Sequence, residues 1–346
     1  MAGKNRKAMR PGGALPVNDD LRRRIAADLL QGADRDALVQ RLAASGIALA
    51  LVRAEVERAE KSPYFAAAAQ HAERMAARLG KRDWLLANQA RLAPLTEVPR
   101  RDGLDAESFF RDHYRAHRPV LLGGLIEHWP ARRKWSLDYL EAAHGQVPVR
   151  VQWDRESDAD YERNADAHGT VKPFAAFLAR LRAEAPSNDV YMTANNHAHN
   201  RQALAALWHD VGDIPGYLSD EPGRDGFLWI GPKGTITPWH HDLTNNLLLQ
   251  VSGTKRVRLA ASHEIARMRN GRHCFSEWGG EKLEAGPVRD DRPAVLCVDI
   301  LPGDMLFIPV GWWHHVEALD VTIGMSFTNF AADNDFYSHY QSYGAL

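Results

Sequence analysis

One short run of the sequence, TPWHHD at residues 237–242, combines side chains that bind metal ions. Alternate residues of a β-strand point to the same face of a sheet, about 6–7 Å apart along the chain. His240 and Asp242 would therefore share a face, whereas His241 would point away. Imidazole and carboxylate groups are common ligands of transition metals. The run predicts that His240 and Asp242 supply two ligands to one metal ion.

A third ligand must come from another strand, and the best candidate lies in the run GWWHH at residues 311–315. The pattern alone does not decide between His314 and His315. Two histidines and one carboxylate leave one face of an octahedral metal open, as in non-haem Fe(II) oxygenases. Zinc binds the same ligand types, so the spacing leaves the metal open as well. Histidines in surface loops are the alternative interpretation.

The elements that must position these residues are short strands. From Phe227 onward, apolar runs alternate with turns rich in Gly, Pro and Asp. The runs are FLWIG, GTITPW, NNLLLQVSG, TKRVRLA, AVLCVDI, DMLFIPV, HHVEALD and VTIGMSF. A further strand is expected over residues 189–194, so the core strands would span about 189–330. This spacing is typical of a β-barrel or jelly roll.

The N-terminal part of the chain has a different spacing of apolar residues. Residues 1–17 read as a flexible tail. Residues 18–93 show helical spacing of apolar residues, which predicts a helical module of several short helices, one of them ending at Gly80. Residues 94–346 form the remaining domain, which carries both histidine motifs.

Composition excludes several classes. The 346 residues include 43 Lys and Arg against 44 Asp and Glu, which gives a net charge of −1. Such a chain has no overall attraction to nucleic acid or anionic membranes, so neither is expected as a partner. The 2 cysteines cannot form a disulfide framework or a cysteine-rich zinc module. No signal-peptide or membrane-spanning pattern is evident, and a cytoplasmic location is predicted.

The segments GTITPWHHDLTNNLLLQVSGTKRVRL and PGDMLFIPVGWWHHVEALDVTIGMSF closely resemble the JmjC, or cupin-like (cupin_8), hydroxylases. The resemblance covers roughly residues 95–330 and is nearest to the asparaginyl-hydroxylase branch. It implies a mainly β chain with a double-stranded β-helix, or jelly-roll, core that binds Fe(II), 2-oxoglutarate and O2. It also implies that His240, Asp242 and His314 are the ligands, because the first histidine after the paired tryptophans binds metal in this family.

The resemblance also implies a pocket for 2-oxoglutarate. Lys255 matches the family lysine that holds the distal carboxylate, although a solvated lysine at a strand end is the alternative without that match. Ser326 matches a small polar residue on the last core strand, and Asn329 is the alternative for that position. Four residues with hydroxyl or amide side chains match positions of the family's co-substrate pocket: Tyr191, Thr237, Asn246 and Ser326. Four tryptophans are candidates for the dry walls of the pocket, although core packing is the more common role of each taken singly: Trp229, Trp239, Trp312 and Trp313.

The expected activity is that of a 2-oxoglutarate-dependent dioxygenase that hydroxylates a side chain of a peptide or protein and releases succinate and CO2. The alternatives are hydroxylation of a small molecule, demethylation of lysine, and a non-catalytic metal-binding scaffold. The helical module at residues 18–93 carries no catalytic signature. It is a candidate for forming a homodimer, for docking a peptide, or for covering the barrel.

Overall fold

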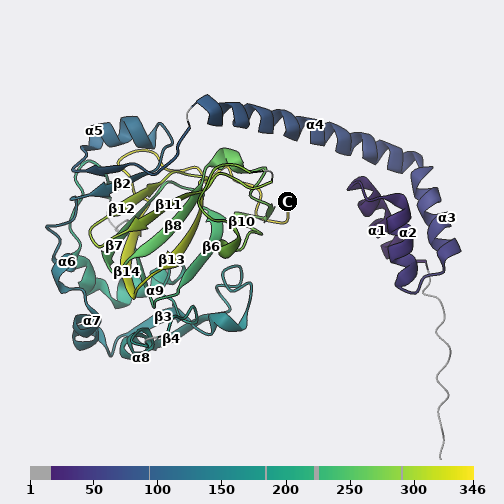
Figure 1. Cartoon of the computed structure of the whole chain (residues 1–346). Coiled ribbons are helices and arrows are strands. Elements are labelled where there is room, and N and C mark those ends of the chain that lie inside the picture. Colours follow the sequence, from purple (N-terminus) through teal and green to yellow (C-terminus); the bar gives the residue numbers. More distant parts are fainter. Residues whose placement is uncertain (1–16, 93, 184, 222–225, 290) are drawn as a thin grey trace, which may run out of the picture. The chain divides into compact units, whose positions relative to one another are not determined.

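The computed structural model describes residues 17–92, 94–183, 185–221, 226–289 and 291–346. The tail predicted for residues 1–17 therefore lies, except for Val17, outside the described residues. The chain divides into two compact units, Met1–Leu86 and Ala87–Leu346 (Figure 1). The domain boundaries given above stay a prediction.

The first unit contains three short helices, α1 (Asp19–Leu30), α2 (Arg35–Ala44) and α3 (Leu49–Glu60). The side chain of Asn18 accepts a hydrogen bond from the Leu21 N–H at 2.9 Å and so caps α1. Asp34 caps α2 in the same way. The buried apolar residues that join the three helices are Leu21, Ile25, Leu38, Val39, Leu42, Ile47, Val52 and Val56.

The fourth helix corrects one prediction. Instead of ending at Gly80, α4 runs without a break from Pro63 to Leu92. A glycine that ends a helix usually adopts a left-handed backbone, and Gly80 has no positive φ angle. A glycine in a helix interior costs only about 1 kcal/mol relative to alanine, and the neighbouring Ala, Arg, Leu and Lys residues are strong helix formers. Among the described residues, no helix has the length and apolarity that crossing a membrane requires.

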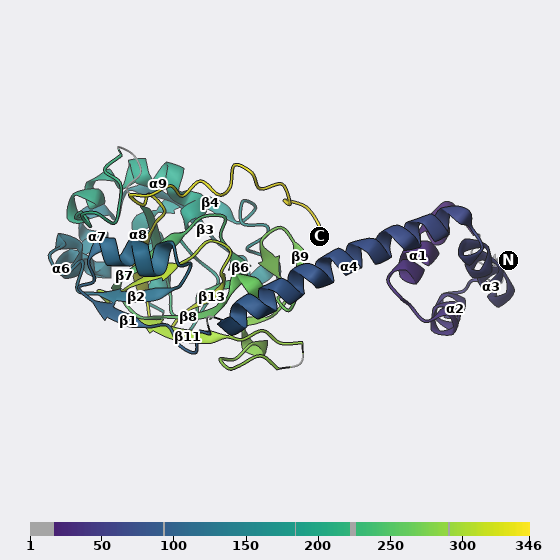
Figure 2. The same ribbon diagram turned by 90° about the horizontal axis from the view of Figure 1, so that it is seen from above.

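The second unit is a jelly roll of two six-stranded sheets, which confirms the predicted fold class (Figures 1 and 2). The first sheet has the order β1 (Arg100–Asp102), β2 (Val120–Gly123), β12 (Met305–Ile308), β7 (Asn246–Ser252), β14 (Thr322–Phe327) and β5 (Phe227–Gly231). The second has the order β11 (Leu296–Ile300), β8 (Lys255–Ala260), β13 (Trp313–Ala318), β6 (Ile236–His241), β10 (Phe275–Ser276) and β9 (Asn270–Arg272). Strands β1 and β2 precede the range predicted for the core strands.

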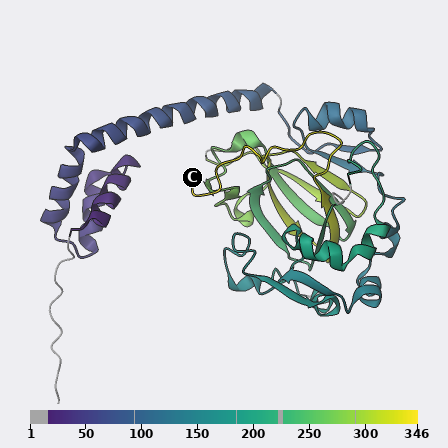
Figure 3. The same ribbon diagram turned by 180° about the vertical axis from the view of Figure 1, so that it is seen from behind.

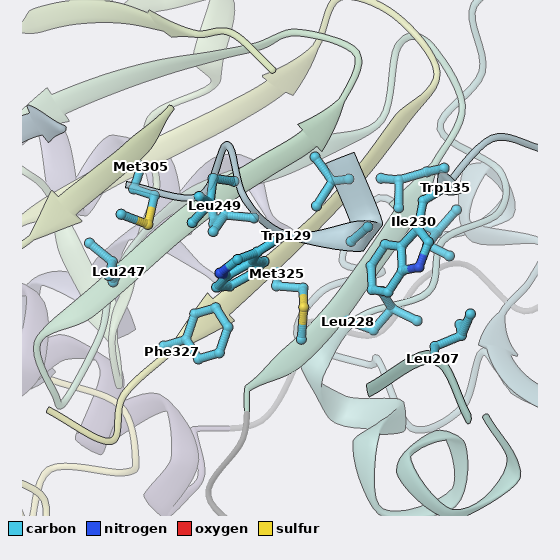
Figure 4. Close-up of a cluster of buried hydrophobic side chains, with 14 of the residues drawn as sticks. Trp129, Trp135, Leu207, Leu228, Ile230, Leu247, Leu249, Met305, Met325 and Phe327 are labelled. Atoms are coloured by element: carbon cyan, nitrogen blue, oxygen red, sulfur yellow. The ribbon is translucent and has the colours of Figure 1, made fainter. Parts of the chain in front are cut away.

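Alternation along the strands of the first sheet fills two cores. Leu248 and Leu306 point into the barrel, where they meet Val257 and Leu259 of the second sheet. Their neighbours point outward and pack against the helical layer of this unit. Figure 4 shows Leu228, Ile230, Leu247, Leu249, Met305, Met325 and Phe327 of the sheet together with Trp129, Trp135 and Leu207 of that layer. The helices are α5 (Ala106–Phe109), α6 (Pro130–Lys134), α7 (Leu137–His144), α8 (Phe174–Leu181) and α9 (His197–Ala203) (Figure 3).

A small two-stranded sheet, β3 (Pro148–Gln152) with β4 (Gly169–Pro173), lies outside the two large sheets. The strand predicted over residues 189–194 is not a regular strand. Only Tyr191 and Met192 form isolated bridges, the first to Gln152 and the second to Ile230. Through these two bridges the segment pairs with β3 on one side and with β5 on the other. Thr193 then caps a helical turn.

The turn between β7 and β8 generates a prediction about stability. Gly253 has a φ of 71°, and a Cβ there would lie 2.1 Å from the Val321 carbonyl oxygen. Gly103 also has a positive φ, 60°, but a Cβ there would meet no atom within 4 Å. Gly103→Ala should lower the unfolding free energy by about 1–2 kcal/mol through the left-handed backbone alone. Gly253→Ala should lower the unfolding free energy by a clearly larger amount, because the backbone at Val321 must also move. Equal losses in urea denaturation would contradict this explanation.

Candidate functional site

The three residues predicted as metal ligands meet at one end of the barrel. His240 lies near the end of β6, Asp242 follows that strand, and His314 lies on the neighbouring strand β13. One donor atom of each lies within 4.8 Å of the other two. The Nε2 atoms of His240 and His314 both lie 3.8 Å from a carboxylate oxygen of Asp242. Two neutral imidazoles and one carboxylate at this spacing can coordinate a single divalent ion.

Backbone carbonyl groups orient both imidazole rings. The Nδ1 atom of His240 lies 2.8 Å from the Pro238 oxygen, and that of His314 lies 3.0 Å from the Trp312 oxygen. Because a carbonyl oxygen can only accept, each Nδ1 carries the proton and each Nε2 keeps its lone pair for a metal. Asn246 donates a hydrogen bond from Nδ2 to Asp242 Oδ2 at 2.9 Å, which fixes the carboxylate.

A β-bulge in β6 explains how Thr237 comes to the same side as His240. On β13, His314 pairs with His240 while Val316 pairs with Thr237, so β6 has one more residue than its partner between these pairs. Simple alternation would turn Thr237 away from His240, because the two are three positions apart. The extra residue restores Thr237 to the barrel interior.

The histidines beside the ligands face elsewhere. The ring of His241 packs edge-on against Trp313, with ring centres 4.7 Å apart. His315 is buried against Trp239 and Arg258. Burial lowers the pKa of His315 to about 3, so its ring stays neutral. The geometry brings His314, and not His315, close to His240 and Asp242, which favours His314 as the third ligand.

A cavity of about 50 Å³ adjoins the triad between the two sheets. Four of the five residues predicted to contact the co-substrate line it, namely Tyr191, Thr237, Asn246 and Lys255. Ser326 does not line it and instead accepts a hydrogen bond from the indole N–H of Trp229 at 2.8 Å. Its rival Asn329 lies in a separate, larger cavity.

Lys255 is the most unusual group in the small cavity. Its side chain is only 2% exposed, and its Nζ lies 3.4 Å from the hydroxyl oxygen of Tyr191. Among the described residues, no carboxylate forms an ion pair with it. Burial lowers the pKa of Lys255 to about 8, and it raises the pKa of Tyr191 far above its ordinary value. A buried ammonium group with only a neutral hydroxyl beside it is suited to an anionic ligand.

The tryptophans and the cavity walls differ from expectation. Trp229 lines the cavity, but Trp239 and Trp313 pack on the outer face of the second sheet, and Trp312 contacts His117. The apolar wall consists of residues that the sequence analysis missed, Leu248, Ile308 and Val316. Strand alternation from Asn246 and from His314 could have identified Leu248 and Val316.

Comparisons with known proteins agree with this site. A jelly roll with two histidines and one carboxylate at one end of its interior is the arrangement of a cupin-type metal protein. Residues 106–335 match the family model of the cupin-like domain, and the chain belongs to this family, which includes the JmjC proteins. Family and triad together give the chain a cupin-like domain with a candidate metal site.

Individual relatives cover most of the second unit. Lysine-specific demethylase JMJ30 of Arabidopsis thaliana is 32% identical over 244 residues, which is 66% of this chain and 54% of that protein. Jumonji C domain-containing protein 5 of Drosophila melanogaster is 31% identical over 255 residues, 68% of this chain and 62% of that protein. The tRNA wybutosine-synthesizing protein 5 of Gallus gallus is 26% identical over 253 residues, 69% and 78% of the two chains.

The chain spans less than two thirds of the first two relatives' length. The relatives also bear on three expectations, which concern nucleic acid, the branch of the family and the location. The exclusion of nucleic acid as a partner is not supported, because one relative is named for tRNA. The nearness to the asparaginyl-hydroxylase branch and the cytoplasmic location stay predictions.

The geometry of the triad predicts which histidine the metal requires. Mn(II) should raise the melting temperature of the wild-type protein, and His314→Ala should abolish this rise. His315→Ala should retain it, although the loss of a buried ring lowers the starting temperature. Asn246→Ala should weaken metal binding about 10–100-fold, because Asp242 loses its hydrogen bond. A metal-induced shift that survives in His314→Ala and disappears in His315→Ala would show that the ligand is misassigned.

Proposed function

We propose that the chain is an Fe(II)- and 2-oxoglutarate-dependent oxygenase that hydroxylates a side chain of a peptide or protein and releases succinate and CO2. The observation that carries this proposal is a single cavity lined by both the triad and a buried lysine. A metal site alone would suit zinc equally well. The buried cation beside it adds a place for the second carboxylate of a dicarboxylic co-substrate.

The residues present fit both groups. Two imidazole nitrogens and one carboxylate oxygen suit Fe(II) and leave coordination positions open for a 2-oxo acid and O2. When bound, the iron supplies the activation of O2 that is coupled to oxidation of 2-oxoglutarate. The role of the protein is to orient these groups and to keep water away from them.

Each lining residue then has a role that follows from its position. The ammonium group of Lys255, with the hydroxyls of Tyr191 and Thr237, would hold the distal carboxylate. A charge-assisted contact of this kind contributes about 1.5–3 kcal/mol. The unpaired side-chain oxygen of Asn246 faces no protein donor within the described residues and remains available to a bound water or co-substrate. The apolar side chains of Leu248, Ile308 and Val316 exclude water.

The larger cavity is the candidate place for the substrate, and its size is compatible with part of a peptide as well as with a small molecule. It has a volume of about 770 Å³, and Thr244, two residues beyond Asp242, lies in its wall. Phe227 and Thr328 also line it, at the ends of β5 and β14 that adjoin the start of β7. The cavity therefore has a wall residue two positions from a candidate metal ligand, and its volume would admit a side chain together with part of its backbone.

Lysine demethylation is the second candidate. Two carboxylate residues of the larger cavity, Asp333 and Asp335, would favour a cationic side chain. Several relatives, among them JMJ30 of Arabidopsis thaliana, are named as lysine-specific demethylases. Demethylation begins with hydroxylation of an N-methyl group, so both candidates use the same site. Release of formaldehyde from a methylated peptide would distinguish demethylation from stable hydroxylation.

Loss of the carboxylate ligand tests the proposed activity. Asp242→Ala should reduce succinate formation from 2-oxoglutarate to background, because the metal loses its only charged ligand. The assay contains Fe(II), ascorbate and 2-oxoglutarate, with and without candidate peptides. His315→Ala serves as the control and should keep measurable turnover. Unchanged succinate production in Asp242→Ala would overturn the assignment.

Titration of Lys255 gives a pH prediction. The folded pKa of about 8 lies below the ordinary lysine value, so the free protein loses the ammonium charge as pH rises through 8. Binding of 2-oxoglutarate should be strongest below this pH and weaken by up to about tenfold per unit above it. Tyr191 remains neutral throughout. Lys255→Met should raise the 2-oxoglutarate KM far more than it lowers kcat, and should remove the pH dependence between about 7 and 9. Identical co-substrate titration curves for both proteins would refute this role.

A further inference from the structure

Arg155 is a fully buried arginine that the metal centre does not use. It follows β3 directly after Asp154, whose φ of 62° turns the chain sharply. The Arg155 side chain has 0% exposure, although arginine is rarely buried without strong pairing. Arg155 does not itself line the co-substrate cavity. It contacts Tyr191, which does line the cavity, and therefore lies close to it.

The guanidinium group joins segments from three parts of the chain. It lies over the ring of Tyr161 at 4.3 Å and over the ring of Tyr191 at 5.1 Å. Its Nη2 donates a hydrogen bond to the Ile236 oxygen on β6 at 2.9 Å, one residue before Thr237. The same nitrogen lies 3.4 Å from the Glu162 carboxylate. Arginine can make such a combination because its charged fork is planar and stacks on aromatic rings.

Tyr191 therefore lies between two buried cations. Arg155 is close to its ring, while the Lys255 ammonium lies 5.9 Å from the ring centre and 3.4 Å from the hydroxyl. The backbone of Tyr191 is held by its bridge to Gln152. The orientation of the tyrosine side chain depends on its neighbours. Thr237 on β6 interacts with its hydroxyl group, and Arg155 lies against its ring while bonding the same strand at Ile236.

The hydrogen bonds of Arg155 use only one of its three side-chain nitrogens. Within the described residues, no acceptor reaches its buried Nε and Nη1 atoms. Removing one partner of a buried ion pair is destabilising, so Arg155→Met should also lower stability through the loss of the pair with Glu162. The residues that the guanidinium positions are those that it contacts, the rings of Tyr161 and Tyr191 and the Ile236 carbonyl group.

We propose that Arg155 is a positioning residue for co-substrate binding, which clamps Tyr191 so that its hydroxyl stays beside Lys255. The inference rests on the proposed function, because the distal carboxylate of 2-oxoglutarate is the ligand that this pair receives. Tyr161 completes the clamp as the second ring on the guanidinium. The clamp connects the segment between β3 and β4 to the wall of the cavity.

The test measures 2-oxoglutarate affinity by calorimetry on the Mn(II)-loaded protein, without turnover. Arg155→Met should raise Kd about tenfold, whereas in a Tyr191→Phe background the same change should raise it less than about threefold, because the hydroxyl that it positions is gone. The melting-temperature rise caused by Mn(II) should be unchanged in Arg155→Met. In turnover assays, KM for 2-oxoglutarate should rise while kcat changes little.

Arg180→Met is the matched control. Arg180 also pairs with a carboxylate, Asp189, and also lies over a ring, that of Trp153, but it does not reach Tyr191. Its replacement should leave the Kd unchanged. If Arg155→Met does not fold, Tyr161→Leu carries the same test, because it removes one ring of the clamp and leaves the charge.

Two failures are distinguishable. If the wild-type protein binds Mn(II) but no 2-oxoglutarate, the proposed function is wrong. If the wild-type protein binds 2-oxoglutarate and the Arg155→Met or Tyr161→Leu variant binds it equally well, the clamp is wrong. Equal effects of Arg155→Met in the wild-type and Tyr191→Phe backgrounds would also overturn it, because Arg155 would then act independently of the hydroxyl.

Discussion

A buried ammonium group without a carboxylate partner among the described residues is the constraint on which the rest of the site depends. Lys255 lies in the interior of the barrel with a neutral tyrosine hydroxyl as its nearest polar contact. Burying a charge in this way is unfavourable, and this burial lowers the pKa of Lys255. An anionic ligand relieves it. The apolar walls that make the cation costly also make its attraction to a carboxylate strong, because little water screens the pair.

The barrel places this cation at a fixed distance from the metal ligands. Lys255 begins β8, and β8 pairs with β13, which carries His314. The bulge in β6 turns Thr237 to the same side as His240. Hydrogen bonds from the two imidazoles to backbone carbonyls set the direction of the free ring nitrogens. Both histidines and the cation are thus positioned by strand pairing, whereas Asp242 directly follows β6 and is held by its hydrogen bond from Asn246.

Much of this arrangement could be predicted from the sequence. Short alternating runs identified the strands from β5 onward except the short β9 and β10, and alternation from His240 placed Asp242 on the same side. The failures have physical causes. Thr237 depends on a bulge that alternation cannot show, and its placement came from the family resemblance. Gly80 continues a helix because strong helix formers surround it. Arg155 lies in a charged stretch, DRESDADYER, whose composition suggests an exposed loop.

The most direct test of the central claim is an anaerobic crystal structure with Mn(II) and 2-oxoglutarate. We expect one metal ion bound by Nε2 of His240, Nε2 of His314 and the Asp242 carboxylate. We also expect the 2-oxo acid end of the co-substrate on the metal and its distal carboxylate at Lys255. A metal bound through His315, or a co-substrate whose distal carboxylate lies away from Lys255, would contradict the claim.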